Sequence, residues 1–481
     1  MKFQTKDCLL YGVILICCIN LFIAPAHGGT KAMLELLKIL RDRGTLSQDE
    51  FEMLRNAAKA EEEEASEPRQ PHNGNPEVAE QKKKPTEEVA KVHPNSLEQD
   101  SIKVKTNYKG LTVETADGDF KFGIGGRLQM DANFAGEGRT PRRSGTEIRR
   151  ARINVQGSMW KIWGYRLQAD FAGNYTTAIK NAYIEYTGFK PVSFILGQQK
   201  LPFTLQSWTS NNWQVFQERA LLNSFIQNEV IGRRGLGFRA STYGRYWTAN
   251  AGIFSESVGR MSRFRESWAP MGRVTFAPIA EATQVLHFGA SAYYRNYVQE
   301  PELVFTAHPE AHLVPPLIST GVISGTEDIL LLGGELSGVW GPFHAQGEYL
   351  HVKVGRKKGL PDPDFNGWYA QAGYFLTGES RSYDPTKGRY NRIHPSGIVG
   401  KGGWGAWELA FRYSTLDLTD NGILGGVENN FTVGLNWYAT PSILFRANYI
   451  HAGTDFIDKA TRLEGIEGGL DIYTLRGQIA F

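Results

Sequence analysis

Cysteine is almost absent from this chain, and the few that occur stand together at its beginning. All three cysteines of the 481 residues, Cys8, Cys17 and Cys18, lie among the first 18 positions. The remainder of the chain therefore has no disulfide framework, no thiolate zinc site and no cysteine nucleophile.

Long hydrophobic runs are also missing after the first 26 residues. No later stretch holds 18 or more apolar residues, which excludes a transmembrane helix there. The only other fold that satisfies every backbone group in lipid is a closed barrel.

Catalytic and phosphate-binding motifs are absent as well. The ten histidines are scattered, and the sequence contains no HExxH, GxSxG or P-loop pattern. An outer-membrane barrel enzyme remains an alternative, but we expect no enzyme, no cofactor and no metal site. Nucleic-acid binding is not expected, since the arginines alternate along strands and form no single basic stripe.

The N-terminal residues 1–26 are typical of a secretory signal peptide. Lys2 and Lys6 precede an apolar stretch, and Ala24-Pro25-Ala26 offers small residues for cleavage. An uncleaved N-terminal anchor is the alternative.

Residues 27–100 differ in composition from the rest. Residues 27–60 predict a short helical hairpin, too small to bury a core alone and so a possible oligomerisation element. Residues 61–100, rich in Glu, Lys, Pro and Gln, predict an acidic disordered linker. Residues 27–100 carry 11 basic and 16 acidic side chains, against 40 basic and 33 acidic in 101–481.

From Phe120 to the C-terminus, segments of alternating apolar and polar residues recur. In the last of them, Tyr473, Leu475 and Ile479 share one face while Thr474 and Arg476 share the other. We count about sixteen: 120–134, 146–158, 163–173, 178–187, 192–199, 233–242, 246–255, 269–277, 284–295, 329–339, 343–353, 367–376, 405–414, 430–438, 443–451 and 471–481.

These segments predict an all-β fold, a transmembrane antiparallel barrel of about 16 strands in residues 101–481. Short and long connections alternate, as in bacterial barrels with short periplasmic turns and long outer loops. Residues 377–404 break this rhythm, because a long connection falls on the short-turn side. Either this connection is an unusual periplasmic excursion or the strands around it are miscounted. A soluble protein of several β-sandwiches is the competing fold, but the outward rows are too apolar for water.

The opposite, polar face of the strands is rich in arginine. The basic side chains expected in the lumen are Lys121, Arg127, Arg150, Arg152, Arg166, Arg239, Arg273, Arg295, Arg412, Arg446 and Arg476. The acidic ones are Asp131, Asp170, Glu185, Glu335, Glu348 and Glu408. A wall with mostly one sign of charge concentrates counter-ions, and guanidinium groups suit phosphate oxygens. The lumen therefore favours anions, unless its charges pair with one another.

Two segments stand out on this face. In EIRRAR, 147–152, alternation points Arg150 and Arg152 inward and leaves Arg149 at the rim of its strand. The connection 200–232 is rich in aromatic and polar side chains, so we expect it to fold into the pore and narrow it. Packing of this loop on a neighbouring subunit is the alternative.

Several stretches resemble the phosphate-selective porin family, the O/P type of Gram-negative outer membranes. They are GGRLQMDANF (125–134), EIRRARINVQG (147–157), NAYIEYTGFKPVSFILGQ (181–198), TSNNWQVFQERAL (209–221), FLTGESRSY (375–383), GAWELAFRYSTLDL (405–418) and VGLNWYATPSILFRANYIHA (433–452). The resemblance implies a sixteen-stranded homotrimeric barrel in the outer membrane, whose third outer loop folds inward and whose arginines guide anions.

The resemblance also implies an anion-binding site. Positions that match phosphate-contacting residues of the family are Arg127, Arg149, Arg150, Ser210 and Arg219, with Arg152, Asn211 and Asn212 at altered positions of the same site. Lys180 replaces an acidic residue and Arg152 an aromatic one, so phosphate, pyrophosphate and polyphosphate are all candidate solutes. A general diffusion porin is the alternative, as is a barrel that mainly tethers a periplasmic partner through the N-terminal arm.

Overall fold

The computed structural model describes residues 102–136, 144–173, 177–227, 231–257, 267–455 and 469–481, together with Gln48 and Glu52. The chain separates into two compact units, Met1–Pro94 and Asn95–Phe481. In the first unit, Gln48 and Glu52 are helical and Gln48 Nε2 donates to Glu52 Oε1 at 3.2 Å. The predicted signal peptide, hairpin and linker otherwise lie outside the described residues.

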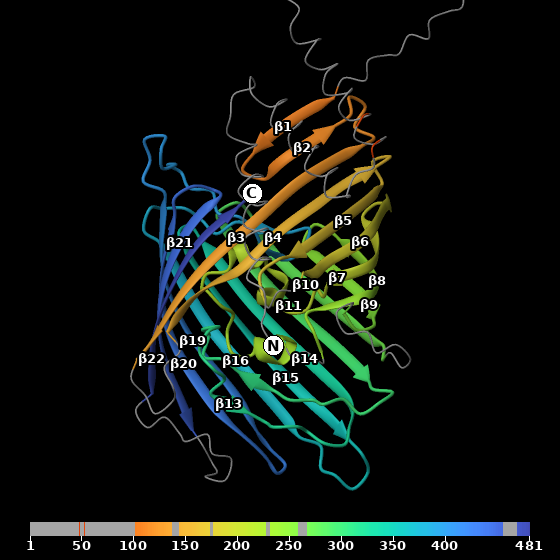
Figure 1. The fold of residues 1–481 in the computed structure, drawn as a ribbon, viewed down its shortest axis with the longest axis vertical. Coiled ribbons are helices and arrows are strands. Elements are labelled where there is room, and N and C mark those ends of the chain that lie inside the picture. The colour runs from red at the N-terminus through yellow and green to blue at the C-terminus, as the bar shows by residue number, and fades with distance from the viewer. Residues whose placement is uncertain are drawn as a thin grey trace, which may run out of the picture. The chain divides into compact units, whose positions relative to one another are not determined.

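Residues from Lys121 onward form a closed antiparallel barrel of sixteen strands (Figure 1). The strands are β3 (Lys121–Ala135), β4 (Gly145–Met159), β5 (Trp163–Asp170), β6 (Ala178–Phe189), β7 (Val192–Lys200), β8 (Arg234–Tyr243), β9 (Trp247–Phe254), β10 (Ala269–Ala280), β11 (Gln284–Asn296), β14 (Thr326–Trp340), β15 (Phe343–Arg356), β16 (Asp364–Phe375), β19 (Ala406–Asp420), β20 (Ile423–Tyr438), β21 (Ile443–Asp455) and β22 (Leu470–Ala480). Each pairs with the next, and β22 pairs with β3 to close the ring. The predicted fold class is confirmed.

Every segment predicted from alternation corresponds to one of these strands, with differences at the ends. The largest is the β19–β20 hairpin, which extends to a two-residue turn, Asn421-Gly422. Both turn residues have positive φ, 44° and 82°, as a type I′ hairpin turn requires. Alternation missed these outer ends because the two rows exchange faces there: Leu416 and Leu418 are buried on the inner face, whereas Thr415 and Asp417 lie on the outer face.

The alternation itself reflects two environments. Along β22, Tyr473 and Leu475 are half-exposed on the outer face, whereas Thr474 and Arg476 are buried inside. A wall with apolar side chains outside and polar ones inside is what a bilayer around a hydrated interior selects. No helix among the residues that the structure describes is long and apolar enough to cross a membrane.

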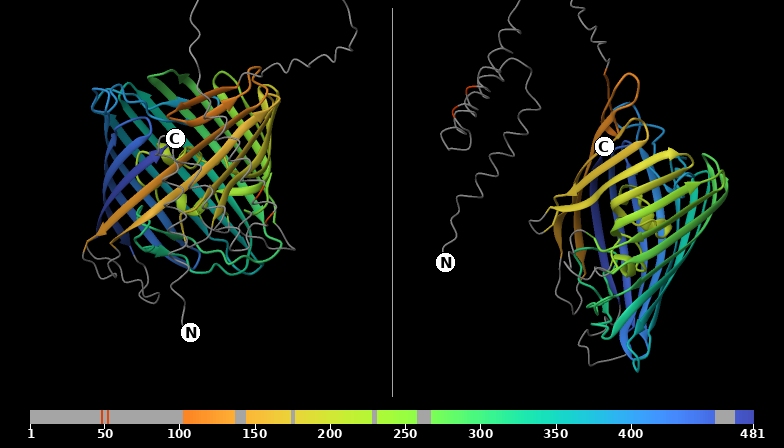
Figure 2. Two further views of the ribbon diagram at one scale, coloured as in Figure 1. Left: turned by 45° about the horizontal axis from the view of Figure 1, so that its top comes forward. Right: turned by 90° about the vertical axis from the view of Figure 1, so that its right-hand side faces the viewer.

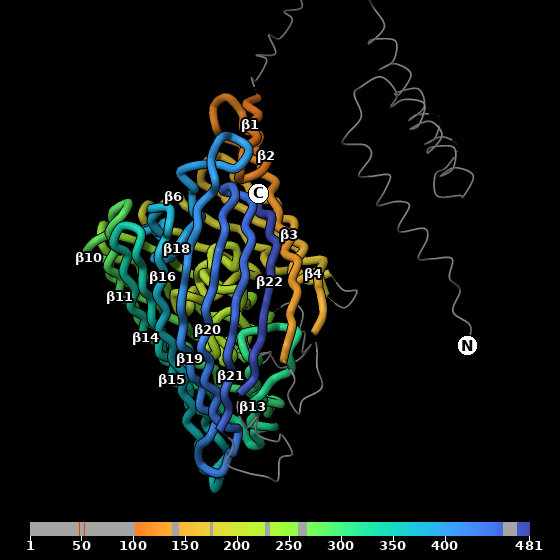
Figure 3. Tube along the Cα trace, turned by 90° about the vertical axis from the view of Figure 1, so that its left-hand side faces the viewer, coloured from red at the N-terminus to blue at the C-terminus, as the bar shows by residue number. Residues whose placement is uncertain are grey.

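A further hairpin continues the sheet at the short-turn end. Strands β1 (Lys103–Asn107) and β2 (Gly110–Glu114) pair, and β2 continues beside β3 beyond the point where β22 ends. Figure 3 shows this hairpin above β3, next to the C-terminus. Gly126 N–H donates to the carbonyl of Phe481 at 2.7 Å, which fixes the end of the chain against β3.

Two long connections from the far end and one from the short-turn end contribute buried residues inside the barrel, among them Leu222, Phe305 and Tyr390. Figure 2 shows the short helices of the first connection within the ring of strands. The first, 201–233, contains α4 (Leu205–Trp208), the 3-10 helix η1 (Asn211–Trp213) and α5 (Asn223–Gln227). The second, 297–325, contains β12 (Thr306–Ala307) and β13 (Ile318–Ser319), and the third, 376–405, contains β17 (Tyr383–Asp384) and β18 (Arg389–Tyr390). They are called the first, second and third inward segments below.

The first two inward segments build a hydrophobic core inside the barrel. Phe225 packs edge-on against Phe305 at 5.1 Å between ring centroids, and Phe305 packs against Phe365 of β16 at 5.7 Å. Leu350 and Leu416 of the wall are fully buried in the same cluster. One side of the lumen is thus filled by apolar packing, and any water-filled path is confined to the remaining side.

Candidate functional site

The first inward segment is anchored through its backbone to arginines of the opposite wall. Arg446 donates to the carbonyls of Phe216 at 3.0 Å and Gln214 at 2.5 Å. Arg476 donates to the carbonyl of Gln217 at 2.6 Å. These wall arginines are buried, and they donate hydrogen bonds to backbone carbonyl oxygens of the segment. Buried carbonyl groups in proteins generally need such partners.

The third inward segment enters from the short-turn end and meets the first. Trp208 Nε1–H donates to the carbonyl of Lys387 at 2.9 Å, and Arg273 donates to the carbonyl of Gly388 at 2.8 Å. Tyr390 hydrogen-bonds Ser337 of β14. The long connection that broke the predicted rhythm is therefore a genuine excursion into the barrel and not a miscounted strand.

The second inward segment is held by one buried carboxylate. Glu310 pairs with Arg412, and it accepts hydrogen bonds from Ser414 Oγ at 2.5 Å and Thr432 Oγ1 at 2.8 Å. Its His312 Nδ1 lies 2.9 Å from Glu147 Oε1 at the start of β4. The segment is thus fixed to the wall on two sides.

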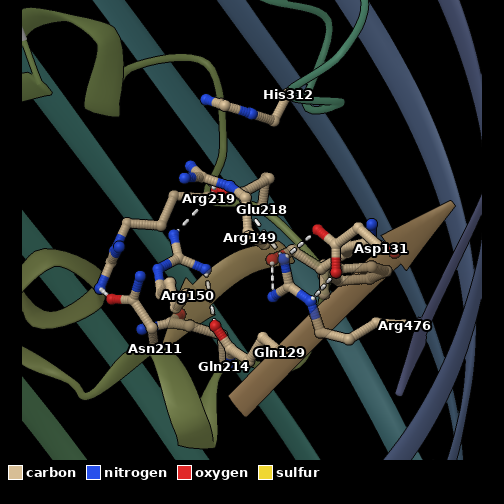
Figure 4. Close-up of polar contacts among 12 residues, drawn as sticks. Gln129, Asp131, Arg149, Arg150, Asn211, Gln214, Glu218, Arg219, His312 and Arg476 are labelled. Carbon is tan, nitrogen blue, oxygen red and sulfur yellow. Dashed lines mark hydrogen bonds and ion pairs between the residues drawn. The ribbon is translucent and has the colours of Figure 1, made fainter. Parts of the chain in front are cut away.

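Arg149 and Arg150, predicted as wall ligands of an anion, instead contact a carboxylate of the chain itself (Figure 4). Arg149 Nε donates to Glu218 Oε1 at 2.9 Å, and Arg150 Nη2 lies 3.5 Å from Glu218 Oε2. Arg476 Nη2 donates to Glu218 Oε1 at 3.0 Å. Glu218, in the first inward segment, occupies the position that an anion between these guanidinium groups would take.

A β-bulge explains why two consecutive arginines reach the interior. Gln129 pairs with Arg150 and Met130 with Ile148, so Arg149 is an extra residue on β4. A bulge redirects a side chain that strict alternation would send the other way. The prediction that Arg149 lies only at the rim is wrong for this reason.

Glu218 is negatively charged in this setting. Burial by itself would raise the pKa of Glu218, but the guanidinium groups of Arg149, Arg150 and Arg476 outweigh burial and hold that pKa well below its usual value. With Asp131 and Glu147 nearby, three arginines face three carboxylates. This cluster, called the Glu218 cluster below, is close to neutral.

Arg219 also serves the first inward segment. Its Nε donates to the carbonyl of Gln206 at 3.0 Å, and its Nη2 donates to the carbonyl of Thr209 at 3.1 Å and to Asn211 Oδ1 at 2.5 Å. Burial and then the charge of Arg233 lower the pKa of Arg219. Arg219 is 4% exposed, so it holds the segment in shape and offers little surface to a solute.

Ser210 and Asn212 shape the same turn. Ser210 Oγ accepts from the backbone N–H of Asn212 at 3.3 Å and thereby caps η1. The carbonyl of Asn212 accepts from Gln478 Nε2 of β22 at 3.3 Å. The Ser210 side chain and the Asn212 backbone are thus engaged within the protein, while Asn212 Oδ1 is buried without a hydrogen-bond partner.

A second group of cations lies against the wall of β3 to β8. This group, called the cationic strip below, consists of Arg127, Arg152, Lys180, Arg233 and Arg234. Each of them is partly exposed. The charges of Arg127, Arg152 and Arg233 all act on Arg234, so these cations are electrostatic neighbours.

One carboxylate faces the cationic strip directly. Arg152 Nε donates to Asp170 Oδ2 at 2.6 Å. The side chains of Arg127, Lys180, Arg233 and Arg234 form no ion pair with any residue in the described ranges. Burial lowers the pKa of Arg233 to about 10, which leaves it protonated at neutral pH. The strip therefore carries a large net positive charge.

Several buried arginines of the interior have carboxylate partners. Arginines that are almost fully buried, such as Arg273, Arg412 and Arg476, pair with Glu335, Glu310 and Asp131. The partly exposed cations of the strip are largely without carboxylates. Of the predicted site, Arg127 and Arg152 belong to this strip, whereas Arg149, Arg150, Ser210, Asn211, Asn212 and Arg219 are engaged in internal contacts.

Sequence reasoning overlooked Glu218, and it recognised residues 377–404 as anomalous without placing them inside the barrel. Glu218 directly precedes Arg219 in a stretch singled out for its basic and polar residues, so its charge was visible. The stretch 381–392 concentrates Arg and Tyr, a composition suited to stacking in a polar interior. Within the described ranges, no group of three or more His, Cys, Asp or Glu side chains is arranged to hold a metal ion.

Comparisons with known proteins agree with this architecture. Porin O of Pseudomonas aeruginosa is 30% identical over 425 residues, covering 79% of this chain and 92% of that protein. An uncharacterized protein of Caulobacter vibrioides is 30% identical over 377 residues, covering 75% of this chain and 74% of that protein.

Among solved structures, the anion-selective porin from Comamonas acidovorans superposes with a TM-score of 0.50 at 13% identity, covering 75% of this chain and 100% of that one. This likeness concerns the fold alone. The family model described as phosphate-selective porin O and P matches residues 122–481. With that match over most of the chain and the 30% identity to Porin O, the chain belongs to the phosphate-selective porin O and P family.

Proposed function

We propose that this porin is a channel for passive diffusion of small inorganic anions along the wall of β3 to β8. The barrel and the family membership indicate the outer membrane of a Gram-negative bacterium, where the outer face contacts lipid. The charges of the strip carry the proposal: of its five partly exposed cations only Arg152 has a carboxylate partner among the described residues, whereas the buried Arg273, Arg412 and Arg476 are all paired. A low-dielectric wall with this bias concentrates anions and repels cations.

Oxyanions fit the strip better than halides do. Arg127, Arg152 and Arg234 present planar forks of N–H donors, which match the oxygens of phosphate in pairs. Several cations converge, so pyrophosphate and polyphosphate are further candidates. The family's description and the name Porin O support phosphate as the first solute to test.

The three inward segments narrow the path in this proposal. They fill part of the lumen with apolar packing and buried ion pairs. A solute is then forced past the cationic strip. Family membership favours such a channel over an outer-membrane enzyme.

A general diffusion porin is the second candidate, and the Glu218 cluster is the observation that favours it. Because Glu218 neutralises Arg149 and Arg150, one predicted ligand group contributes little positive field. Selectivity then depends on the strip alone.

The deciding experiment is the single-channel reversal potential in a planar bilayer under a salt gradient, repeated with phosphate and pyrophosphate. We expect an anion-selective potential, and block of the chloride current by micromolar to millimolar phosphate. Arg127→Gln and Arg234→Gln should each shift the potential toward zero, while Lys161→Gln, at the exposed rim, should not. A potential near zero or cation-selective in the wild type contradicts anion selectivity.

Self-association as a homotrimer is part of the proposal. Strands β5 and β9 have eight residues each, fewer than the roughly 9–11 that a tilted strand needs to cross a bilayer. A neighbouring copy of the chain that packs against the wall at these short strands would cover this part of the barrel.

A further inference from the structure

We propose a second oxyanion-binding site on the short-turn side of the constriction, formed by Arg166 of β5, Arg239 of β8 and Arg389 of β18 around the indole ring of Trp208. The inference rests on the proposed function, the passage of anions through the barrel. It adds a second binding site along their path. Its three guanidinium groups come from two wall strands and from the third inward segment.

Trp208 holds two of these groups in place. The Cζ atoms of Arg239 and Arg389 lie 5.1 Å and 5.0 Å from the centroid of its ring. Both distances are within the roughly 6 Å at which a cation is attracted to an aromatic face. The ring itself is fixed, because its N–H donates to the carbonyl of Lys387 on the same hairpin as Arg389. Like charges are therefore kept close together at defined positions.

Arg166 completes the group from the neighbouring wall. Its positive charge acts on Arg389, and the charge of Arg389 acts on Arg239. The protein partner of the Arg166 side chain is Asn154, at 3.5 Å, a long contact to a neutral oxygen. Arg166 is thus an electrostatic neighbour of Arg389, which lies with Arg239 against the ring of Trp208.

Arg239 Nη1 donates to Asn250 Oδ1 at 3.4 Å, but two other donors of this group have no protein acceptor. The Nε atoms of Arg166 and Arg239 are buried and have no partner, and Arg239 is only 7% exposed. A buried charged donor without an acceptor is costly unless a ligand supplies one. Two carboxylates act on the group from nearby, Glu185 on Arg239 and Asp384 on Arg389, but neither forms an ion pair with a member among the described residues.

The site is distinct from the cationic strip. Arg239 follows Arg234 by five positions along β8, which corresponds to about 16 Å along the strand. Arg166 likewise lies four positions before Asp170 on β5, toward the short-turn end. A tetrahedral oxyanion of the size of phosphate could occupy one station and then the other. Conduction through such a pore requires sites strong enough to admit the ion and weak enough to release it.

The test compares Arg389→Gln with Lys387→Gln as its matched control. Both substitutions remove one positive charge from the same hairpin, but the Lys387 side chain lies near Asp384 at 3.6 Å and is exposed. Inorganic phosphate is added to one side of a planar bilayer at a time, and its half-blocking concentration for the chloride current is measured. In Arg389→Gln we expect that concentration to rise about tenfold from the short-turn side and much less from the other side.

Arg166→Gln provides a second, independent variant, because Arg166 lies on a wall strand and not on the hairpin. It should raise the half-blocking concentration from the same side, and Lys387→Gln should behave like the wild type. If Arg389→Gln and Arg166→Gln both match Lys387→Gln in a channel that remains anion-selective, the second site is wrong and the proposed function stands. A wild-type channel without anion selectivity overturns both.

Discussion

Arg476 of the last strand donates two hydrogen bonds to Asp131 of the first barrel strand, 345 positions earlier: Nε to Oδ1 at 2.7 Å and Nη2 to Oδ2 at 2.6 Å. The pair spans the seam where β22 meets β3. Arg476 also reaches the carbonyl of Gln217 and the carboxylate of Glu218. One side chain therefore joins the closure of the barrel to the first inward segment.

Arg476→Ala should destabilise the barrel markedly. It leaves Asp131 buried without a partner, a change that costs about 3–5 kcal/mol of unfolding free energy. The free energy of unfolding can be measured by urea titration in detergent, with the mobility shift of the folded band on a gel as the readout. Arg127→Ala is the control, since Arg127 is inward on the same seam but has no carboxylate partner in the described chain, and it should be close to the wild type. Equal stability of the two variants would contradict the role of the seam pair.

Glu218→Gln should strengthen anion binding. It removes the carboxylate that Arg149 and Arg150 contact, so their donors become available to a solute, and the half-blocking phosphate concentration should fall about tenfold. Asp119→Asn, which removes a partly exposed carboxylate at the short-turn end, should leave the half-blocking concentration unchanged. An unaltered half-block in Glu218→Gln would mean that the Glu218 cluster lies off the path.

The same carboxylate predicts a pH dependence. Since the pKa of Glu218 in the folded protein is well below the usual 4.5, its ion pairs contribute stability that is fully present above pH 4.5 and is lost only as the pH falls through the lower folded value. Wild-type phosphate block should therefore change little through Glu218 between pH 7 and pH 5. At lower pH the wild type should approach the behaviour of Glu218→Gln, while that variant shows no such step. A step in the wild type above pH 5 that is absent from the variant would refute this.

Replacing residues 382–391 with a short Gly-Ser linker should widen the channel. This removes the part of the third inward segment that touches Trp208 and Arg273, while Arg392 still anchors the connection through the carbonyls of Tyr108 and Pro441. Single-channel conductance should rise, and phosphate block from the short-turn side should weaken. The same replacement in the exposed turn 357–361 serves as the control. Unchanged conductance in the first variant would show that the hairpin does not restrict the path.

Glu310→Ala should release the second inward segment. Arg412 would lose its buried partner, and Ser414 and Thr432 would lose their acceptor, at a cost of about 3 kcal/mol or more. Limited proteolysis of the purified porin should then cut within 297–325 much faster than in the wild type. Glu302→Gln, an exposed position in the same segment, should not change the cleavage rate. Equal protection of Glu310→Ala would show that other contacts hold the segment.

We propose that residues 27–100 form a periplasmic arm that assists trimer association. Deleting them should leave single-channel conductance and selectivity intact, because the strip and the inward segments lie within 102–481. The temperature at which the trimer dissociates in detergent should fall. A deletion variant with undiminished trimer stability, or one without conductance, would count against this role.

The barrel was predictable because its signal is local. Alternation along β22 or β3 requires only neighbouring residues, since a strand places successive side chains on opposite faces. The Asn421-Gly422 turn was equally visible as a hairpin signal, although the predicted strands stopped short of it. Residues 377–404 could be recognised as an unusually long connection on the short-turn side, but their position inside the barrel could not be predicted.

The sequence by itself determined the sixteen-stranded wall, its apolar outer face and the excess of arginine inside. Only the tertiary structure decided which arginines remain available to a solute. Arg476 finds Asp131 across 345 positions, and Glu218 meets Arg149 because a bulge and an inward segment bring them together. Pairing depends on which residues the closed barrel places in contact, and no local pattern encodes those contacts. The barrel fold can therefore be predicted from the local pattern of each strand. The net charge that faces the pore depends on contacts between residues far apart in the sequence.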